Sequence, residues 1–152
     1  TRYLLVSLGS FSGDMDVSWT RFDEKYTADL ANGLGNLCSR VAKLCEKSDF
    51  HLPHVTLEIS DQYKSAMNEF DLDKAVGHVM DLVAELDKSL ADSQPWKKEG
   101  EEQRLILEAA VEQICLIAFQ LQPFMPETAK KIFTHFGQEK ITAIQPLFPR
   151  LS

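Results

Sequence analysis

The stretch YTADLANGLGNLCSR, from Tyr26 to Arg40, decides the fold of this 152-residue chain. Its apolar residues recur at steps of three and four, within the stretch and just beyond it, at Leu30, Leu34, Leu37, Val41 and Leu44. That spacing predicts an amphipathic helix. The interior of this helix nevertheless contains Gly33 and Gly35, each of which should destabilise it by about 0.5–1 kcal/mol relative to alanine. Helix stability therefore does not explain these two residues.

Four further segments show helical patterning. With the first they give the expected helices 19–47, 61–69, 72–94, 101–121 and 126–136. Ser18 and Asp71 are suitable N-caps, and Pro126 suits a first turn. Segment 101–121 is apolar on most of its circumference and should be the most buried. No β-alternation persists, so the sequence predicts an all-α fold, a bundle of four or five helices.

The domain organisation expected from these segments is simple. Residues 1–17 should be a connector, residues 18–137 the helical domain, and residues 138–152 a C-terminal tail packed on the bundle. Within the connector, residues 1–9 are apolar and could form a helical turn, whereas residues 10–18 should be a loop.

Composition and charge exclude several classes of protein. Hydrophobic content is 44% and charged content 26%, as in soluble globular domains, and no apolar run approaches the length of a membrane span. The net charge of −7 argues against non-specific nucleic-acid binding, which depends on Lys and Arg. It leaves room for an RNA site made of a few residues on one face. Cys38, Cys45 and Cys115 have no disulfide spacing and predict buried thiols in a reducing compartment.

Catalytic and metal chemistry receive little support from the residues. His51 and His54 could ligate a metal, but no further His or Cys lies at a useful spacing, so both are interpreted as loop residues without function. The three cysteines sit among apolar neighbours and are interpreted as packed thiols. The run NGLGN lies inside a helical pattern rather than after a strand, which excludes a phosphate-binding loop.

A second stripe of polar residues follows the first helix. It comprises Asp29, Asn32, Asn36, Arg40, Lys43 and Lys47. Asn36 and Arg40 lie one turn apart on the same face, and an amide beside a planar guanidinium can hydrogen-bond a base edge. On spacing alone, a solvated helix face is the commoner explanation of such a stripe.

Trp96 is the other feature with two interpretations. It follows the end of a helix in the run QPWKKEG. Tryptophan between helices is most often a core or hinge plug. The alternative is a stacking platform for an unpaired base, with Lys97 and Lys98 near the backbone phosphates.

Taken in order, five motifs resemble a known family: RYLL, YTADLANGLGNLCSR, ADSQPWK, QLQPFMPETAKKIFTHFG and PLFPR. With this spacing the chain resembles, over nearly its whole length, the C-terminal anticodon-binding domain of methionyl-tRNA synthetase, a class I aminoacyl-tRNA synthetase. The combination of DLANxLGNLxSR with a later PW is specific to that family.

The resemblance implies a set of site residues. Asn36, Arg40 and Trp96 would read a C-A-U anticodon, chiefly its first base, and Pro95 would shape the same site. Lysines along the site could contact phosphates, namely Lys43, Lys47, Lys97 and Lys98. Family members often carry an acid five residues before the tryptophan, but this chain has Ala91 there, so the helper contact expected from that acid is in question. Gly33 and Gly35 would permit close approach by a neighbouring helix or by RNA backbone.

The resemblance also implies what the chain lacks. The family's His-Ile-Gly-His and Lys-Met-Ser-Lys-Ser signatures do not occur, so the chain alone should bind no cofactor and activate no methionine. The parent would be a cytoplasmic methionine–tRNA ligase whose catalytic half uses ATP and carries zinc. Expected partners are a tRNA with a C-A-U anticodon and that catalytic domain, with no membrane. The alternative is a free-standing helical protein–protein interaction module.

Overall fold

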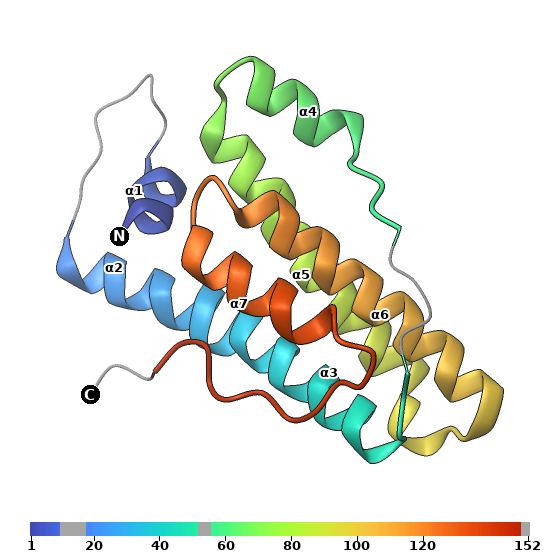
Figure 1. The fold of residues 1–152 in the computed structure, drawn as a ribbon. Coiled ribbons are helices and arrows are strands. Elements are labelled where there is room, and N and C mark those ends of the chain that lie inside the picture. The colour runs from blue at the N-terminus through green and yellow to red at the C-terminus, as the bar shows by residue number, and fades with distance from the viewer. Residues whose placement is uncertain (10–17, 52–55, 150–152) are drawn as a thin grey trace.

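A bundle of helices makes up the computed structural model, which describes residues 1–9, 18–51 and 56–149 (Figure 1). The elements are α1 (Arg2–Leu8), α2 (Trp19–Lys25), η1 (Tyr26–Gly35), α3 (Asn36–Lys47), α4 (Asp61–Asn68), α5 (Leu72–Ser93), η2 (Pro95–Lys97), α6 (Gly100–Leu121) and α7 (Pro126–Phe136). Within these ranges no strand forms, and one isolated bridge joins His51 to Lys140. The all-α prediction is therefore confirmed. The loop expected at residues 10–18 lies almost entirely outside the described residues.

Within the described residues there is one helix more than the expected maximum of five. Elements α2, η1 and α3 run on without a break, so the described ranges hold six separate helices besides the short η2. The additional helix is α1, whose seven residues are too few to show a period in sequence. It belongs to the bundle, because Tyr3 is only 1% exposed and α1 packs against α5.

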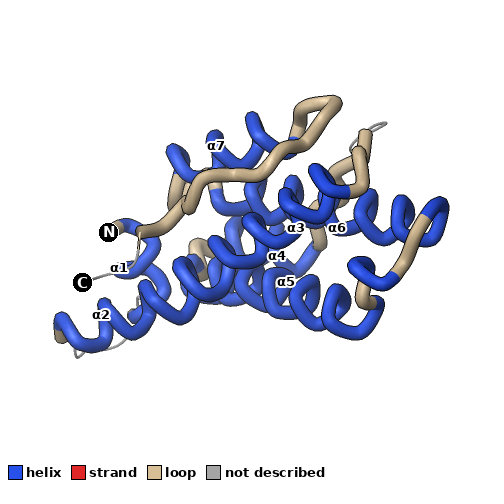
Figure 2. The backbone as a smooth tube through the Cα atoms, turned by 90° about the horizontal axis from the view of Figure 1, so that it is seen from below, coloured by secondary structure: helices blue, strands red, loops and turns tan. Residues whose placement is uncertain are grey.

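Helix α6 lies at the centre of the bundle and contacts α3, α5 and α7 (Figures 1 and 2). Its buried residues include Leu107, Val111, Ile114 and Leu121, which confirms that this segment is the most buried. The expected apolar stripe of α5 is also buried, from Ala75 through Leu90. Burial of about 25 cal/mol per Å² of apolar surface along these faces is the main stabilising contribution to such a bundle.

The middle of the long first helix is π-helical rather than α-helical. Element η1 spans ten residues, and in a π-helix each N–H bonds to the carbonyl five residues earlier. A Cβ added at Gly33 would lie 3.1 Å from the Ala28 carbonyl oxygen, and one at Gly35 would lie 2.9 Å from that of Leu30. Both carbonyls are five residues back. The glycines therefore accommodate the wide turn of their own helix.

The expectation that a neighbouring helix approaches these glycines is only partly met. On Gly33, side chains of α5 come no nearer to an added Cβ than 3.9 Å, which is ordinary contact. On Gly35, the ring of Phe148 in the C-terminal tail would lie at 3.2 Å. The close neighbour from elsewhere in the chain is thus the tail.

Both ends of the described chain are fastened to η1. The Tyr3 hydroxyl donates to the Asp29 carboxylate at 2.6 Å, and the Tyr26 hydroxyl donates to the Pro149 carbonyl at 2.8 Å. Figures 1 and 2 show that the tail runs along the bundle and that its last described part lies at the same end as the N-terminal helix, whereas the turn between α5 and α6 lies at the other end.

The helix starts follow the sequence signals with one exception. Ser18 accepts the expected capping bond from the Arg21 N–H, and Pro126 occupies the first turn of α7. Asp71 occupies the N-cap position of α5, but its side chain makes no capping bond and is paired with Lys74 instead. A carboxylate at this position can bind a cation one turn ahead as well as an N–H.

Candidate nucleic-acid interface

Arg40 lies on α3 beside α5, where its guanidinium Nη2 donates to the Asp87 carboxylate in an ion pair. The two side chains remain 36% and 54% exposed. Because α3 begins at Asn36 with ordinary α-helical geometry, Asn36 lies one turn before Arg40 on the same face. Asn36 is exposed. An amide and a guanidinium therefore face solvent side by side, as the spacing predicted.

The polar stripe expected along the whole first helix is shorter than the sequence indicated. Asp29 and Asn32 belong to η1, where α-helical periodicity does not hold. The Asp29 carboxylate is occupied by Tyr3 of α1 and by Lys25 at 2.9 Å. The stripe therefore starts at Asn36 and continues through the exposed lysines of α3, Lys43 and Lys47.

Trp96 sits on a turn that is held from several sides. Gln94 adopts left-handed geometry with φ 48° and ends α5, and the three residues of η2 follow it. The Gln103 side-chain amide donates to the Pro95 carbonyl at 2.8 Å. Pro95 is buried, while Trp96 is 48% exposed. Pro95 is thus packed into the protein, whereas about half of the surface of Trp96 is open to solvent.

The two parts of the candidate site are connected by α5. Asp87, the partner of Arg40, lies on this helix, and Trp96 lies on the turn η2 that follows its end. From Asp87 to the last helical residue, Ser93, the helix rises by about 9 Å, at about 1.5 Å per residue. Among the described residues no hydrogen bond joins any two of Asn36, Arg40 and Trp96. They therefore offer separate contact points to an extended ligand.

The four lysines interpreted as phosphate contacts differ in availability. The Lys98 ammonium is paired with Glu102 at 2.8 Å. Within the part of the chain that the structure describes, Lys43, Lys47 and Lys97 make no ion pair and are exposed. A free ammonium group can neutralise a phosphate without first losing a protein partner.

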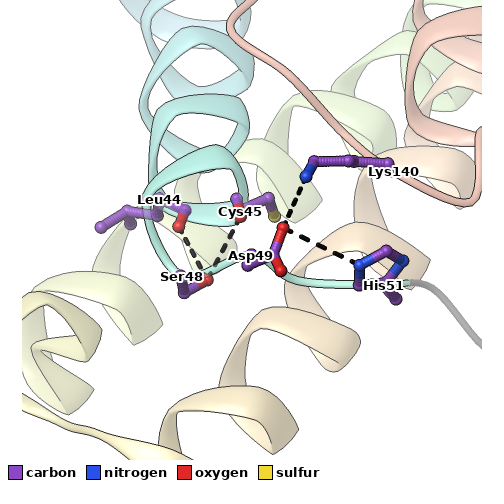
Figure 3. Close-up of polar contacts among 6 residues, drawn as sticks. All are labelled: Leu44, Cys45, Ser48, Asp49, His51 and Lys140. Carbon is purple, nitrogen blue, oxygen red and sulfur yellow. Dashed lines mark hydrogen bonds and ion pairs between the residues drawn. The ribbon is translucent and has the colours of Figure 1, made fainter.

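His51 lies in the segment after α3, next to an ion pair on the protein surface (Figure 3). Asp49 Oδ1 lies 2.6 Å from Lys140 Nζ and 3.8 Å from His51 Nε2. The hydrogen bond from Lys140 and its charge lower the pKa of the Asp49 carboxyl, with a smaller contribution from His51. The Ser48 hydroxyl donates to the Leu44 and Cys45 carbonyls at 2.9 and 3.3 Å and closes the helix end. His51 therefore joins a surface ion pair that ties this segment to the tail.

Metal chemistry has no visible support in the described ranges. No group of three or more His, Cys, Asp or Glu side chains suitable for a metal occurs in them, and His54 lies outside them. The three cysteines are free and buried. Cys38 is fully buried, as predicted for a packed thiol, and burial, followed by the charge of Cys115, raises its pKa to about 12.

Asp87 and Gln103 belong to the candidate site but were not predicted from the sequence. Asp87 lies four residues before Ala91, hence on the same face of α5. Asp87 is thus a carboxylate one turn before Ala91, paired with Arg40, and a search of that face of the helix for an acid would have found it. Gln103 left no signal, because its contact with Pro95 depends on how α6 folds back against η2.

Comparison with known proteins defines the family. The model of the family "Anticodon-binding domain of tRNA ligase" matches residues 49–152. The chain belongs to this family. A methionine–tRNA ligase of Corynebacterium efficiens is 30% identical over 95% of this chain and 27% of its own length. That of Thermotoga maritima is 28% identical over 91% of this chain and 25% of its own.

Solved structures agree with the sequence relatives. The free methionyl-tRNA synthetase of Mycobacterium tuberculosis superposes with a TM-score of 0.82 at 25% identity, covering 99% of this chain and 38% of that one. The same enzyme with methionyl-adenylate gives a TM-score of 0.83 at 25% identity over 98% and 37%. The chain spans roughly a quarter of the length of the curated relatives it matches. None of the helices in the described ranges is long and apolar enough to cross a membrane.

Proposed function

We propose that this chain recognises the C-A-U anticodon of a tRNA as one part of a methionine–tRNA ligase. Family membership supports anticodon binding, and relatives named methionine–tRNA ligase match nearly the whole chain. Asn36 and Arg40 hydrogen-bond the first base in this proposal, and Trp96 stacks on a base of the loop.

The observation that carries the proposal is the 48% exposure of Trp96 on a clamped turn. A core plug would be buried, as Tyr3 and Phe136 are. A stacking platform must instead pack one ring face on the protein and present the other, because bases stack on open aromatic surfaces. A half-exposed ring on a rigid turn meets that requirement.

The proposal assigns the rest of the reaction elsewhere. Joining methionine to tRNA, with its ATP and zinc, belongs to the catalytic domain of the same enzyme in the cytoplasm, which is this chain's second proposed partner. Trp19 is 84% exposed on α2, near the end of the bundle that holds α1 and the tail (Figure 1). A single exposed apolar side chain is ordinary on a protein surface, so Trp19 is no more than one candidate contact for that proposed partner.

A titration tests the function directly. Anticodon stem-loop RNAs with C-A-U and with each other base at the first position are added to the chain, and binding is followed by fluorescence anisotropy. Preference for the C-A-U loop is expected. Equal affinity for all four loops would refute anticodon reading and favour the protein–protein interaction module.

A further inference from the structure

The Arg40–Asp87 pair places a carboxylate at the edge of the candidate base-reading site. The guanidinium contacts Asp87 through Nη2 and retains further N–H donors in its planar fork. The carboxylate, which accepts this bond at Oδ1, retains Oδ2 as an acceptor. With both side chains partly exposed, the pair presents donors and an acceptor next to one another.

That order of groups matches one base. On its Watson–Crick edge, cytosine alone has two adjacent acceptors, O2 and N3, followed by one donor, the N4 amino group. A guanidinium fork complements two acceptors, and a carboxylate accepts from the cytosine amino group. Uracil reverses the pattern, since it presents O4 and an N3–H at the corresponding positions.

We propose that Asp87 is a specificity-determining residue that accepts a hydrogen bond from the N4 amino group of the first anticodon base while Arg40 binds O2 and N3. The inference rests on the proposed function and adds to it a third residue that hydrogen-bonds the first base. An exposed ion pair contributes little to folding stability. Base recognition therefore gives the Arg40–Asp87 pair a function that stability alone does not.

The nearest alternative is that Asp87 only orients Arg40. The orienting role and the reading role differ in whether binding depends on the N4 amino group of the base. An orienting carboxylate strengthens every contact of Arg40 and is indifferent to the N4 amino group. A reading carboxylate loses its contact when that amino group alone is removed.

A double-mutant cycle between protein and RNA separates them. Two C-A-U stem-loops are compared, one with cytosine and one with pyrimidin-2-one at the first position, which keeps O2 and N3 and lacks only the amino group. The unmodified chain should bind the cytosine loop about tenfold more tightly. In Asp87→Ala this ratio should fall close to one.

Controls decide the remaining outcomes. Glu85→Ala removes the same charge from another exposed position of α5 and should leave the tenfold ratio intact. Asp87→Asn, whose amide can donate to O4, should narrow the preference for cytosine over uracil.

A ratio unchanged in Asp87→Ala, with both affinities lowered equally, overturns the inference alone and leaves anticodon reading in place. Absence of any first-base preference in the unmodified chain overturns the proposed function and this inference together.

Discussion

Gln103 on α6 donates a hydrogen bond to the carbonyl of Pro95 at 2.8 Å, and this bond ties the turn that carries Trp96 to the most buried helix of the bundle. The Lys97 and Lys98 amides also bond back within the turn, to Gln94 and Pro95. The backbone of the turn that carries Trp96 is therefore fixed before any ligand binds, which lowers the entropic cost of ordering it on binding.

Trp96→Ala should weaken binding of the C-A-U stem-loop by roughly 1–3 kcal/mol, the worth of one base–aromatic stack. Because the ring is half exposed, the loss of folding stability should be well below the roughly 3–5 kcal/mol typical of a buried tryptophan. Anisotropy titration and urea unfolding measure the two effects. Trp96→Phe, which keeps a stacking face, is the matched control. A large stability loss with unchanged RNA affinity would make Trp96 a core residue.

Arg40→Ala should weaken the C-A-U loop and reduce its advantage over loops with another first base. A bidentate base contact is worth roughly 1–3 kcal/mol in DNA major-groove readout, a scale applied here to an RNA base. Titrations with the four first-base loops measure the discrimination. If all four loops lose affinity equally, Arg40 contacts phosphate rather than a base.

Lys97→Gln should weaken all stem-loops alike and flatten the dependence of affinity on salt, because a lost phosphate contact lowers the slope by about 0.7 per charge for single strands. Lys98→Gln is the comparison, since the Lys98 ammonium is already paired with Glu102. Its effect should be the smaller one. Titrations at several salt concentrations provide the slopes, and a larger effect at Lys98 would contradict the assignment.

Gly35→Ala should lower the free energy of unfolding by about 1–3 kcal/mol, the usual range for overpacking. Its Cβ would meet the Leu30 carbonyl at 2.9 Å and the Phe148 ring at 3.2 Å. Gly77→Ala on α5 meets nothing within 4 Å and should raise stability by about 0.5–1 kcal/mol. Urea unfolding compares the two. A stabilised Gly35→Ala would show that this part of the first helix is α-helical in solution.

Stability should decline at alkaline pH because of the buried thiols. Burial raises the pKa of Cys45 from 9.0 to about 12, and burial followed by the charge of Glu112 raises that of Cys115 to about 11. Above pH 9 the unfolded chain therefore binds fewer protons than the native one, and the free energy of unfolding falls as pH rises toward 12. Urea unfolding at pH 8 and pH 10 tests the sign. Rapid reaction of the native thiols with a thiol reagent at pH 8 would contradict their burial.

The sequence predicted the parts of the fold that local pattern controls. Apolar spacing located α5 and α6, and a serine and a proline marked the starts of α2 and α7. The π-helical turn was not predictable in this way. Its apolar spacing also fits an α-helix, and only the pair Gly33 and Gly35 indicated that another geometry was present.

The candidate site was predicted where it depends on one helix and missed where it depends on two. Helical spacing alone predicted that Asn36 and Arg40 share one face, and the family resemblance supplied their proposed role. The pairing of Arg40 with Asp87 joins residues 47 positions apart, so it depends on how the tertiary fold brings these two helices within reach of each other. The half-exposure of Trp96 likewise depends on how α6 returns against the turn.

The fastening of both chain ends to η1 has a consequence for how such a module can be combined with others. Tyr3 and Pro149 are held on the same element, and the Trp96 turn lies at the opposite end of the bundle (Figure 1). Tyr3 and Pro149 therefore both lie on the side of the bundle away from the proposed RNA contacts. Fusions, tags and surface immobilisation through either terminus should leave those contacts open, and the same geometry lets one bundle be joined to differing neighbours without redesign of its recognition edge.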